Sequence, residues 1–346
     1  MGKVLFWTPD DGGSRMFRCD LPAEALRARG HEANVSPYVF ASWAKDATVV
    51  AQRPFTDAAL KRVDFMKQLG VRVLLDWDDD HLNIDSEAAP GTYAEYLQPE
   101  RRDNVVRAIR ECAGVVVASP VLAERASRLG AQQVHFVPNG LPARMLSHPG
   151  GDFGDTGGRT VLGWAGTEST AAEFRAFEPV LKQVLKARQK HDDILLRVVG
   201  LNPEYVFHRL FSSDSPIQEH QVQAVGWVRD YDDYLSVCST LDVWLAPYRD
   251  VSFNQAKYPT KALEAAFLGI PIVASDIGPY RWALGGDRPR GFLVLNDPDR
   301  WARAVRNLVR QPQRHTHLVR NAQAWAAHQT IESLVADWEK VLWPTS

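Results

Sequence analysis

Several features that mark special classes of protein are scarce in this sequence. It has 3 cysteines in 346 residues, Cys19, Cys112 and Cys238, and their wide spacing excludes a disulfide framework and a clustered cysteine metal site. No apolar run is long enough to span a bilayer. The chain enters a strand-like segment at residues 4–7 with no signal-peptide pattern, so we expect a soluble cytoplasmic protein.

Charge of either sign is not in excess. The 40 lysines and arginines nearly balance the 42 aspartates and glutamates, which leaves a net charge of -2, so no basic surface indicates a nucleic-acid partner. Hydrophobic residues make up 45% of the chain. That fraction is sufficient for a large core, and the length suggests two domains.

Short apolar runs alternate with longer amphipathic segments along the whole chain. Strands are expected at 3–8, 47–51, 71–76, 114–118 and 134–137, then at 160–164, 194–199, 222–225, 242–246, 271–274 and 292–294. Helices are expected at 20–29, 56–69, 99–112 and 120–129, between the later strands, and over 316–342. This alternation predicts an α/β protein with two doubly wound parallel sheets. We expect domains at 1–140 and 159–320, joined by a linker at 141–158, and a terminal helix at 321–346.

One segment, residues 254–264, carries the strongest functional signal. A polar loop leads into a helix near Pro259, Lys257 and Lys261 lie four residues apart where the helix begins, and Glu264 follows one turn later. Unpaired N–H groups and partial positive charge at a helix start, together with two lysines, favour a multiply charged anion. A glutamate one turn deeper can accept from a sugar hydroxyl, which points to a nucleotide-sugar. The alternative is an amphipathic helix with exposed lysines and a solvated or capping glutamate.

The segment continues as K-x-L-E-A-A-x-x-G-I-P-I-V-A-S from Lys261, which resembles the donor-site signature of GT-B glycosyltransferases, especially the retaining family GT4. Three further stretches resemble that family in the same order: residues 134–140 its interdomain crossover, 161–167 the first strand and turn of its donor domain, and 225–248 its base-binding turn with the next helix and strand. The resemblance covers the C-terminal two thirds. It implies the GT-B fold, in which two Rossmann-like domains face a central cleft and a terminal helix could cross back to the first domain.

The resemblance also implies roles for donor-domain residues. The donor diphosphate would be held by Lys257 and Lys261, the adjoining Tyr258, Pro259 and Thr260, the backbone N–H groups of Gly166 and Thr167, and Arg249; Glu264 would hold the ribose; Gly226, Trp227 and Val228 would flank the base. Two departures are visible. Residues 166–172 lack the Arg and Lys that the family commonly carries there, and the first acid of its E-x7-E pair is replaced by Ala256.

A glycine-rich loop, residues 10–15, follows the first predicted strand. Glycines allow close approach of the backbone to a ligand and leave helix N–H groups accessible, and the family keeps such a loop near the donor phosphates and the acceptor. The candidate contacts to the acceptor or the donor phosphates are Gly12, Gly13, Ser14, Arg15 and Arg18. Ser14 could instead cap a helix.

An acidic run, Asp76, Asp78, Asp79 and Asp80 followed by His81, comes directly after the predicted strand at 71–76. Clustered carboxylates repel one another unless a ligand or cation offsets them. A divalent metal at Asp76, Asp78 and Asp80 fits the D-x-D spacing of the other glycosyltransferase fold, GT-A, but the donor-domain motifs disfavour it. A structural helix-capping run is a second reading. We favour a catalytic role, with Asp78 ahead of Asp79, because Asp78 aligns with a histidine that many GT4 members place beside the transferred sugar. His81 is a candidate contact on the acceptor side of the N-terminal domain.

These observations predict a glycosyltransferase that moves a sugar from a UDP- or GDP-sugar to a hydroxyl acceptor, without a required cofactor or metal. Retention at the anomeric carbon follows from the GT4 resemblance alone, and a true general base at Asp78 would make inversion plausible. The acceptor is left open between a glycan, a lipid-linked sugar, a small molecule and a hydroxylated DNA base. A nucleotide-sugar epimerase and a non-catalytic protein that binds a nucleotide-sugar or glycan are the alternatives. The oligomeric state is not indicated.

Overall fold

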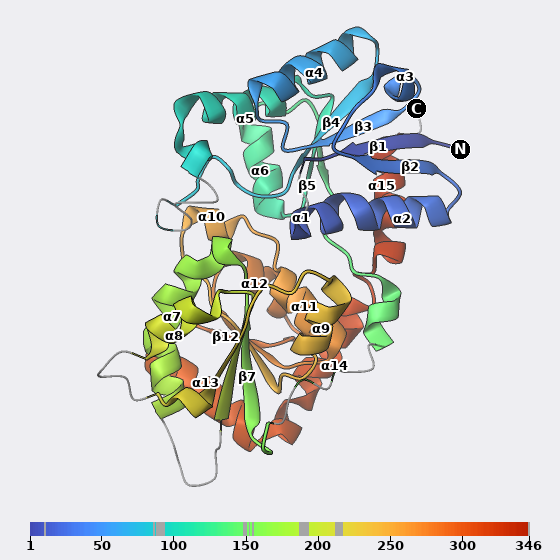
Figure 1. The fold of residues 1–346 in the computed structure, drawn as a ribbon. Coiled ribbons are helices and arrows are strands. Elements are labelled where there is room, and N and C mark those ends of the chain that lie inside the picture. Colours follow the sequence, from blue (N-terminus) through green and yellow to red (C-terminus); the bar gives the residue numbers. More distant parts are fainter. Residues whose placement is uncertain are drawn as a thin grey trace.

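The computed structural model describes residues 1–9, 12–85, 87, 94–147, 151, 153, 156–186, 194–211 and 217–344. The chain folds into two halves, each built around a six-stranded parallel sheet with helices on both faces (Figure 1). The N-terminal half has the strand order β2-β1-β3-β4-β5-β6, and the C-terminal half has the order β12-β11-β10-β7-β8-β9. The predicted α/β class with two doubly wound sheets is confirmed.

The strands are short and mostly buried on both faces. In the N-terminal half they are β1 (Lys3–Trp7), β2 (Glu32–Ser36), β3 (Thr48–Gln52), β4 (Arg72–Trp77), β5 (Gly114–Val117) and β6 (Val134–Phe136); in the C-terminal half they are β7 (Thr160–Ala165), β8 (Ile194–Val199), β9 (Val222–Val225), β10 (Val243–Ala246), β11 (Ile272–Ser275) and β12 (Phe292–Val294). The sequence predicted all of these except β2. That edge strand alternates polar and small residues and has just one fully buried position, Ala33, so it lacks the apolar run that marks the other strands.

Helices connect the successive strands, and further helices follow the last strand. They are α1 (Gly13–Arg15), α2 (Leu21–Ala28), α3 (Ala41–Ala44), α4 (Asp57–Gln68), α5 (Pro99–Glu111), α6 (Pro120–Arg128), α7 (Ala171–Lys186), α8 (Pro203–Leu210), α9 (Tyr231–Cys238), α10 (Ser252–Gln255), α11 (Thr260–Leu268), α12 (Gly278–Leu284), α13 (Pro298–Arg310), α14 (Thr316–Ala326) and α15 (Ile331–Leu342). Several begin at polar caps, such as Thr56 of α4 and Ser119 of α6, whose side chains accept from backbone N–H groups of the first turn.

The predicted terminal helix is two helices, α14 and α15. The break lies at Thr330, whose side chain accepts from the N–H of Ser333 and so caps α15. Helix α15 lies beside α2 in the N-terminal half (Figure 1), where Trp338 packs edge-on against Phe6 with ring centroids 5.4 Å apart. The chain therefore ends on the half in which it began.

The segment that joins the two halves is held by side chains from both. Arg18 donates to the backbone oxygen of Val137, and Tyr258 of the C-terminal half donates to that of Asn139. Of the predicted linker at 141–158, residues 148–150, 152, 154 and 155 lie outside the described residues, and its described part includes a 3-10 turn at Ala143–Ser147.

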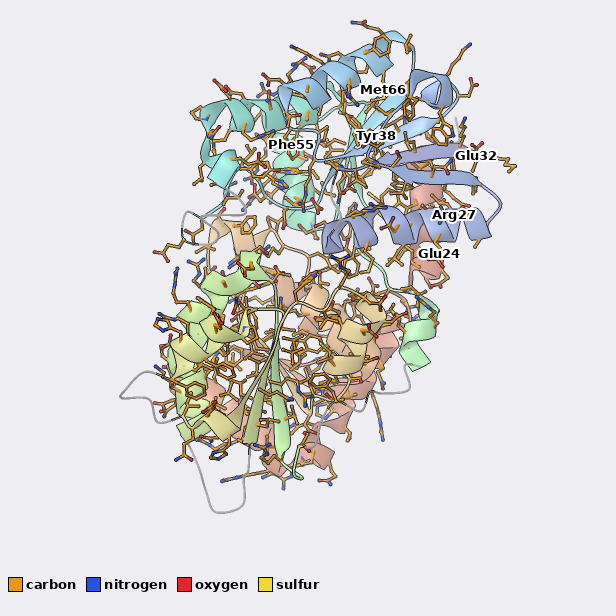
Figure 2. All side chains as sticks on the ribbon, in the orientation of Figure 1. Glu24, Arg27, Glu32, Tyr38, Phe55 and Met66 are labelled. Carbon is orange, nitrogen blue, oxygen red and sulfur yellow. The ribbon has the colours of Figure 1, made fainter. Side chains whose placement is uncertain are left out.

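Apolar side chains pack on both faces of each sheet. Met66 and Phe55 belong to the cluster between the first sheet and α4–α6 (Figure 2), and Phe6 and Trp338 to the cluster on its other face. In the described part of the chain no helix is long and apolar enough to cross a membrane. These two-sided cores leave polar residues to gather where the strands end, in the cleft between the halves.

Candidate functional site

Two adjoining cavities lie between the halves, with volumes of about 450 Å³ and about 770 Å³. Both are lined by Gly12, Gly13, Thr167, Gly200 and Trp227, which come from loops after strands of the two sheets. Ligands of open parallel sheets bind outside the carboxyl ends of the strands. The cavities therefore lie where the fold is expected to place a ligand.

Lys261 and Glu264 project from the first two turns of α11 into the smaller cavity. The helix begins after Pro259 and ends at Gly269, whose φ of 69° gives the left-handed C-terminal cap. Glu264 is 4% exposed, and burial raises its pKa to about 7 although two tyrosines and Lys261 oppose the shift. Burial also lowers the pKa of Lys261 to about 8. A lysine and a carboxylate thus face the same small space.

Glu264 is fixed by two tyrosines of α9. Tyr231 Oη donates to Oε1 over 2.8 Å and Tyr234 Oη donates to Oε2 over 3.2 Å. A carboxylate has about four lone-pair sites, so each oxygen can accept one more hydrogen bond from a ligand. The tyrosines therefore orient the carboxylate and leave each of its oxygens able to accept a hydrogen bond from a ligand.

Lys257 lines the larger cavity and is separated from Lys261 by one turn of chain. Its Nζ lies 3.4 Å from Oδ1 of Asp79 in the N-terminal half and 4.2 Å from the ring centroid of Phe253. Both predicted lysines thus reach the cleft, but each faces a different cavity. Thr260 lines the smaller cavity beside Lys261, and Pro259 forms the N-cap of α11.

The turn after β9 supplies an aromatic side chain to both cavities. Trp227 is 61% exposed and lines each of them, Gly226 lines the larger one and Val228 the smaller one. An exposed indole in a cleft offers a flat face on which a base or sugar can stack. The predicted base-binding turn is therefore brought beside Lys261 and Glu264.

The N–H groups of Gly166 and Thr167, which we expected to help hold the diphosphate, already have partners in this structure. Gly166 donates its N–H to the oxygen of Val199, and Thr167 donates its N–H to Oγ1 of Thr170. Both groups are consumed by the local turn, so they cannot serve as phosphate donors in this conformation. The two residues still line the smaller cavity.

The glycine-rich loop lies at the cleft from Gly12 onward; Asp10 and Asp11 are outside the described residues. Gly12, Gly13 and Ser14 line the larger cavity, and Gly12, Gly13 and Arg15 line the smaller one. Arg18 is placed differently. It is 1% exposed and forms a bidentate ion pair with Asp76, with Nη2 2.8 Å from Oδ2. We therefore correct its predicted ligand contact to a structural one.

Each carboxylate of the acidic run has its own cationic partner. Asp76 pairs with Arg18, Asp78 with Arg53 at 2.6 Å, Asp80 with Arg125, and Asp79 with Lys257. Four separate cations thus offset the repulsion among the four acids. Among the described residues, no group of three or more acids, cysteines or histidines could hold a metal ion.

Asp79, rather than Asp78, forms part of a cavity wall. Asp79 lines the larger cavity, whereas Asp78 is not among the described residues that line either one. Both oxygens of Asp78 accept from Arg53. Burial alone would raise the pKa of Asp78, but the Arg53 charge and hydrogen bonds outweigh it and hold that pKa well below its usual range. The geometry thus places Asp79 at the cavity and Asp78 beside Arg53, while the predicted catalytic order, Asp78 before Asp79, stays a prediction.

Three further candidates lie away from the cavities. His81 is fully buried between Phe55 and Tyr96, and burial lowers its pKa to about 4. Arg249 pairs with Glu173 at 3.2 Å and, across the cleft, with Asp85 at 2.7 Å. Tyr258 binds the interdomain crossover. The contacts that the structure gives these three residues are all within the protein, and none of the three lines either cavity.

Sequence reasoning did not select Arg53, Tyr231 or Gly200, although all three line the cavities. Arg53 directly follows β3, and Gly200 follows β8, so their positions after strands were the available signal. A separate hollow of about 840 Å³ is lined by residues at the start of β7 and β10. It lies at the amino ends of these strands, opposite the expected ligand-binding edge.

Known proteins resemble this chain in part of its sequence and in its fold. Residues 159–311 match the family described as glycosyl transferases group 1, and no curated protein matches the sequence. Over nearly its whole length the fold is similar to sucrose-phosphate synthase from Thermosynechococcus elongatus, with a TM-score of 0.68, 16% identity, and 99% of this chain and 98% of that chain covered. HepE from Anabaena in complex with UDP-glucose has a TM-score of 0.66 and 15% identity, with 99% of this chain and 100% of that chain covered. A glycosyltransferase from Rickettsia africae has a TM-score of 0.65 and 12% identity, with 98% of this chain and 97% of that chain covered.

Proposed function

We propose that this protein is a glycosyltransferase whose donor is a UDP-sugar, because residues 159–311 match the family described as glycosyl transferases group 1 and the whole chain has the GT-B fold. Uridine is favoured over the other bases because similar folds include HepE in complexes with UDP and with UDP-glucose. A hydroxyl group of an acceptor receives the sugar.

The observation that carries the proposal is the juxtaposition of Lys261, Glu264 and Trp227 in one cavity. Lys261 faces the diphosphate, and Lys257 reaches it from the adjoining cavity. Glu264, oriented by Tyr231 and Tyr234, accepts from the ribose hydroxyls, and Trp227 with its two neighbours flanks the base. Phosphates, ribose and base of one nucleotide are thereby matched by a contiguous set of side chains.

Chemistry at the anomeric carbon takes place on the N-terminal side of the cleft. A departing nucleoside diphosphate gains negative charge as the glycosidic bond breaks, and fixed cations stabilise that charge without a metal. Asp79 lines the cavity where the sugar and the acceptor meet, and it is our candidate for a contact to the sugar or the acceptor hydroxyl. The ion pair with Arg53 keeps Asp78 anionic and lowers its pKa. This disfavours Asp78 as a general base and supports retention of configuration at the anomeric carbon.

The location is proposed from the cysteines. All three are free and buried, as suits a protein of a reducing compartment, so we propose a cytoplasmic enzyme. The acceptor remains a glycan, a lipid-linked sugar, a small molecule or a DNA base, and transfer assays with each class would separate them. Turnover of the donor to an isomeric nucleotide-sugar without any acceptor would instead identify an epimerase.

A thermal-shift and hydrolysis screen tests the donor. Wild type, Lys257→Ala, Lys261→Ala and the control Lys340→Ala, whose side chain is 76% exposed on α15, are measured with UDP-, GDP-, ADP- and dTDP-sugars. We expect stabilisation and slow hydrolysis with a UDP-sugar for wild type and the control, and loss of both for the two site variants. Equal responses in all four proteins would contradict the proposed donor site.

A further inference from the structure

Arg53 occupies an unusual place in the fold. It follows the last residue of β3 with φ at +50°, and it is the one residue other than glycine with a positive φ in the described part of the chain. Such a conformation is strained and persists where the surrounding structure fixes it. It directs the side chain of Arg53 to the wall of the larger cavity.

The guanidinium of Arg53 is held in a fixed orientation by Asp78 and Ser14. Nε donates to Oδ1 of Asp78 over 2.7 Å, while Nη2 donates to Oδ2 of Asp78 over 2.6 Å and to Oγ of Ser14 over 2.7 Å. A bidentate pair of this kind fixes the plane of the guanidinium as well as its position. The acid that the sequence suggested as a catalyst is therefore the support of an arginine.

A carboxylate lies between Arg53 and a lysine of the other half. Oδ2 of Asp79 is 3.7 Å from Nη2 of Arg53, and Oδ1 of Asp79 is 3.4 Å from Nζ of Lys257. All three residues line the same cavity. One negative group is thus shared by a cation from each half of the protein.

The C-terminal half offers few other cations for a diphosphate. Residues 166–172, the turn after β7, contain no basic residue until Arg175 in α7, and Arg249 is bound by Glu173 and Asp85. Lys257 and Lys261 remain, together with Arg229, which lines the smaller cavity. A guanidinium from the N-terminal half would add a further cation for the diphosphate. Arg53 of that half lines the larger cavity together with Lys257.

We propose that Arg53 is a catalytic residue of the N-terminal half that binds the leaving phosphate, which replaces the carboxylate of Asp79 between Arg53 and Lys257. This inference rests on the proposed function. The bond from the anomeric carbon to the phosphate oxygen breaks, and its electron pair stays on that oxygen. The acceptor oxygen forms the new bond to the same carbon, and its proton passes to the leaving phosphate. Arg53 stabilises the charge that develops before this proton arrives.

The test compares Arg53→Gln, Arg53→Ala and the control Arg107→Gln, an ion-paired arginine on α5 that is remote from the cavities. The readouts are kcat and KM for UDP-glucose hydrolysis and Kd for UDP. We expect kcat to fall roughly 10²- to 10³-fold in both site variants, with smaller changes in KM and Kd. Added guanidinium ion should restore part of the rate of Arg53→Ala and leave wild type and the control unaltered.

The outcomes separate the inference from the function on which it rests. If Lys261→Ala abolishes UDP binding while Arg53→Gln keeps the wild-type kcat, the donor site stands and the role of Arg53 is refuted. A fall in kcat that guanidinium does not restore, with a lowered unfolding temperature, would show that Arg53 only supports the fold and would also overturn the inference. If wild type neither binds UDP nor hydrolyses UDP-glucose, both proposals fail.

Discussion

Lys257 of the C-terminal half and Asp79 of the N-terminal half form an ion pair across the cleft, with Nζ 3.4 Å from Oδ1. Both side chains are mostly buried, at 12% and 16% exposure, so the pair is less screened by solvent than a surface ion pair. In the function that we propose, the donor diphosphate takes the place of Asp79 beside Lys257. Donor binding would therefore break this contact.

The first prediction concerns that competition. Asp79→Asn removes the charge that competes for Lys257 and Arg53, so UDP should bind roughly threefold to tenfold more tightly than to wild type, while sugar transfer becomes slower. Isothermal titration calorimetry at fixed ionic strength measures the affinity. Asp85→Asn, which breaks the cross-cleft pair with Arg249, is the control and should not tighten binding. Weaker binding of UDP by Asp79→Asn would show that Asp79 supports the site instead of competing for it.

The second prediction is a pH dependence of UDP affinity. Burial lowers the pKa of Lys261 to about 8, so the lysine loses its charge within the pH range in which binding can be measured. Affinity should be retained at neutral pH and fall by up to tenfold per pH unit above about 8. Lys261→Arg, whose guanidinium stays charged throughout, should lack this decline even if its affinity is lower. Parallel pH profiles for wild type and Lys261→Arg would rule out Lys261 as the titrating group.

The third prediction concerns the stability of the ligand-free protein. Burial raises the pKa of Glu264 from 4.5 to about 7, so between these values the unfolded chain releases its proton while the folded protein keeps it. The free energy of unfolding contributed by Glu264 therefore decreases as pH rises from about 4.5 to 7. Urea unfolding at pH 5 and pH 7.5 should show a loss smaller by roughly 1–3 kcal/mol in Glu264→Gln than in wild type. An equal loss in both would mean that Glu264 is ionised across the whole range.

The sequence predicted those parts of the site that one element brings together. Lys257, Lys261 and Glu264 belong to one loop and one helix, so their spacing alone places them near each other, and the ordered motifs predicted both sheets. The pairing of Arg53 with Asp78 could not be foreseen in this way. The two residues are 25 positions apart and meet because β3 and β4 are neighbours in the sheet, a relation that depends on strand order. Likewise, the N–H groups of Gly166 and Thr167 appeared available until their partners in the folded turn were known.

The fourth prediction concerns Gly200, where the backbone of one turn closes against another. Its φ is +93°, and a Cβ added there would lie 2.0 Å from the backbone oxygen of Gly166. The oxygen belongs to a turn that is fixed in place by the hydrogen bond from Gly166 to Val199, so it cannot move aside as a flexible side chain would. Gly200→Ala should therefore destabilise the protein by roughly 2–4 kcal/mol.

Gly226 provides the matched control, because it lies in the neighbouring loop of the same cleft and a Cβ there would meet just Pro203 Cδ, at 3.8 Å. Gly226→Ala should leave the free energy of unfolding within about 0.5 kcal/mol of wild type. Urea unfolding of both variants distinguishes a steric requirement from a general sensitivity of the cleft loops. If Gly200→Ala is as stable as Gly226→Ala, the turns after β7 and β8 can separate. The wall that the two cavities share at Gly200 would then be adaptable, and the donor site would not depend on a preformed shape.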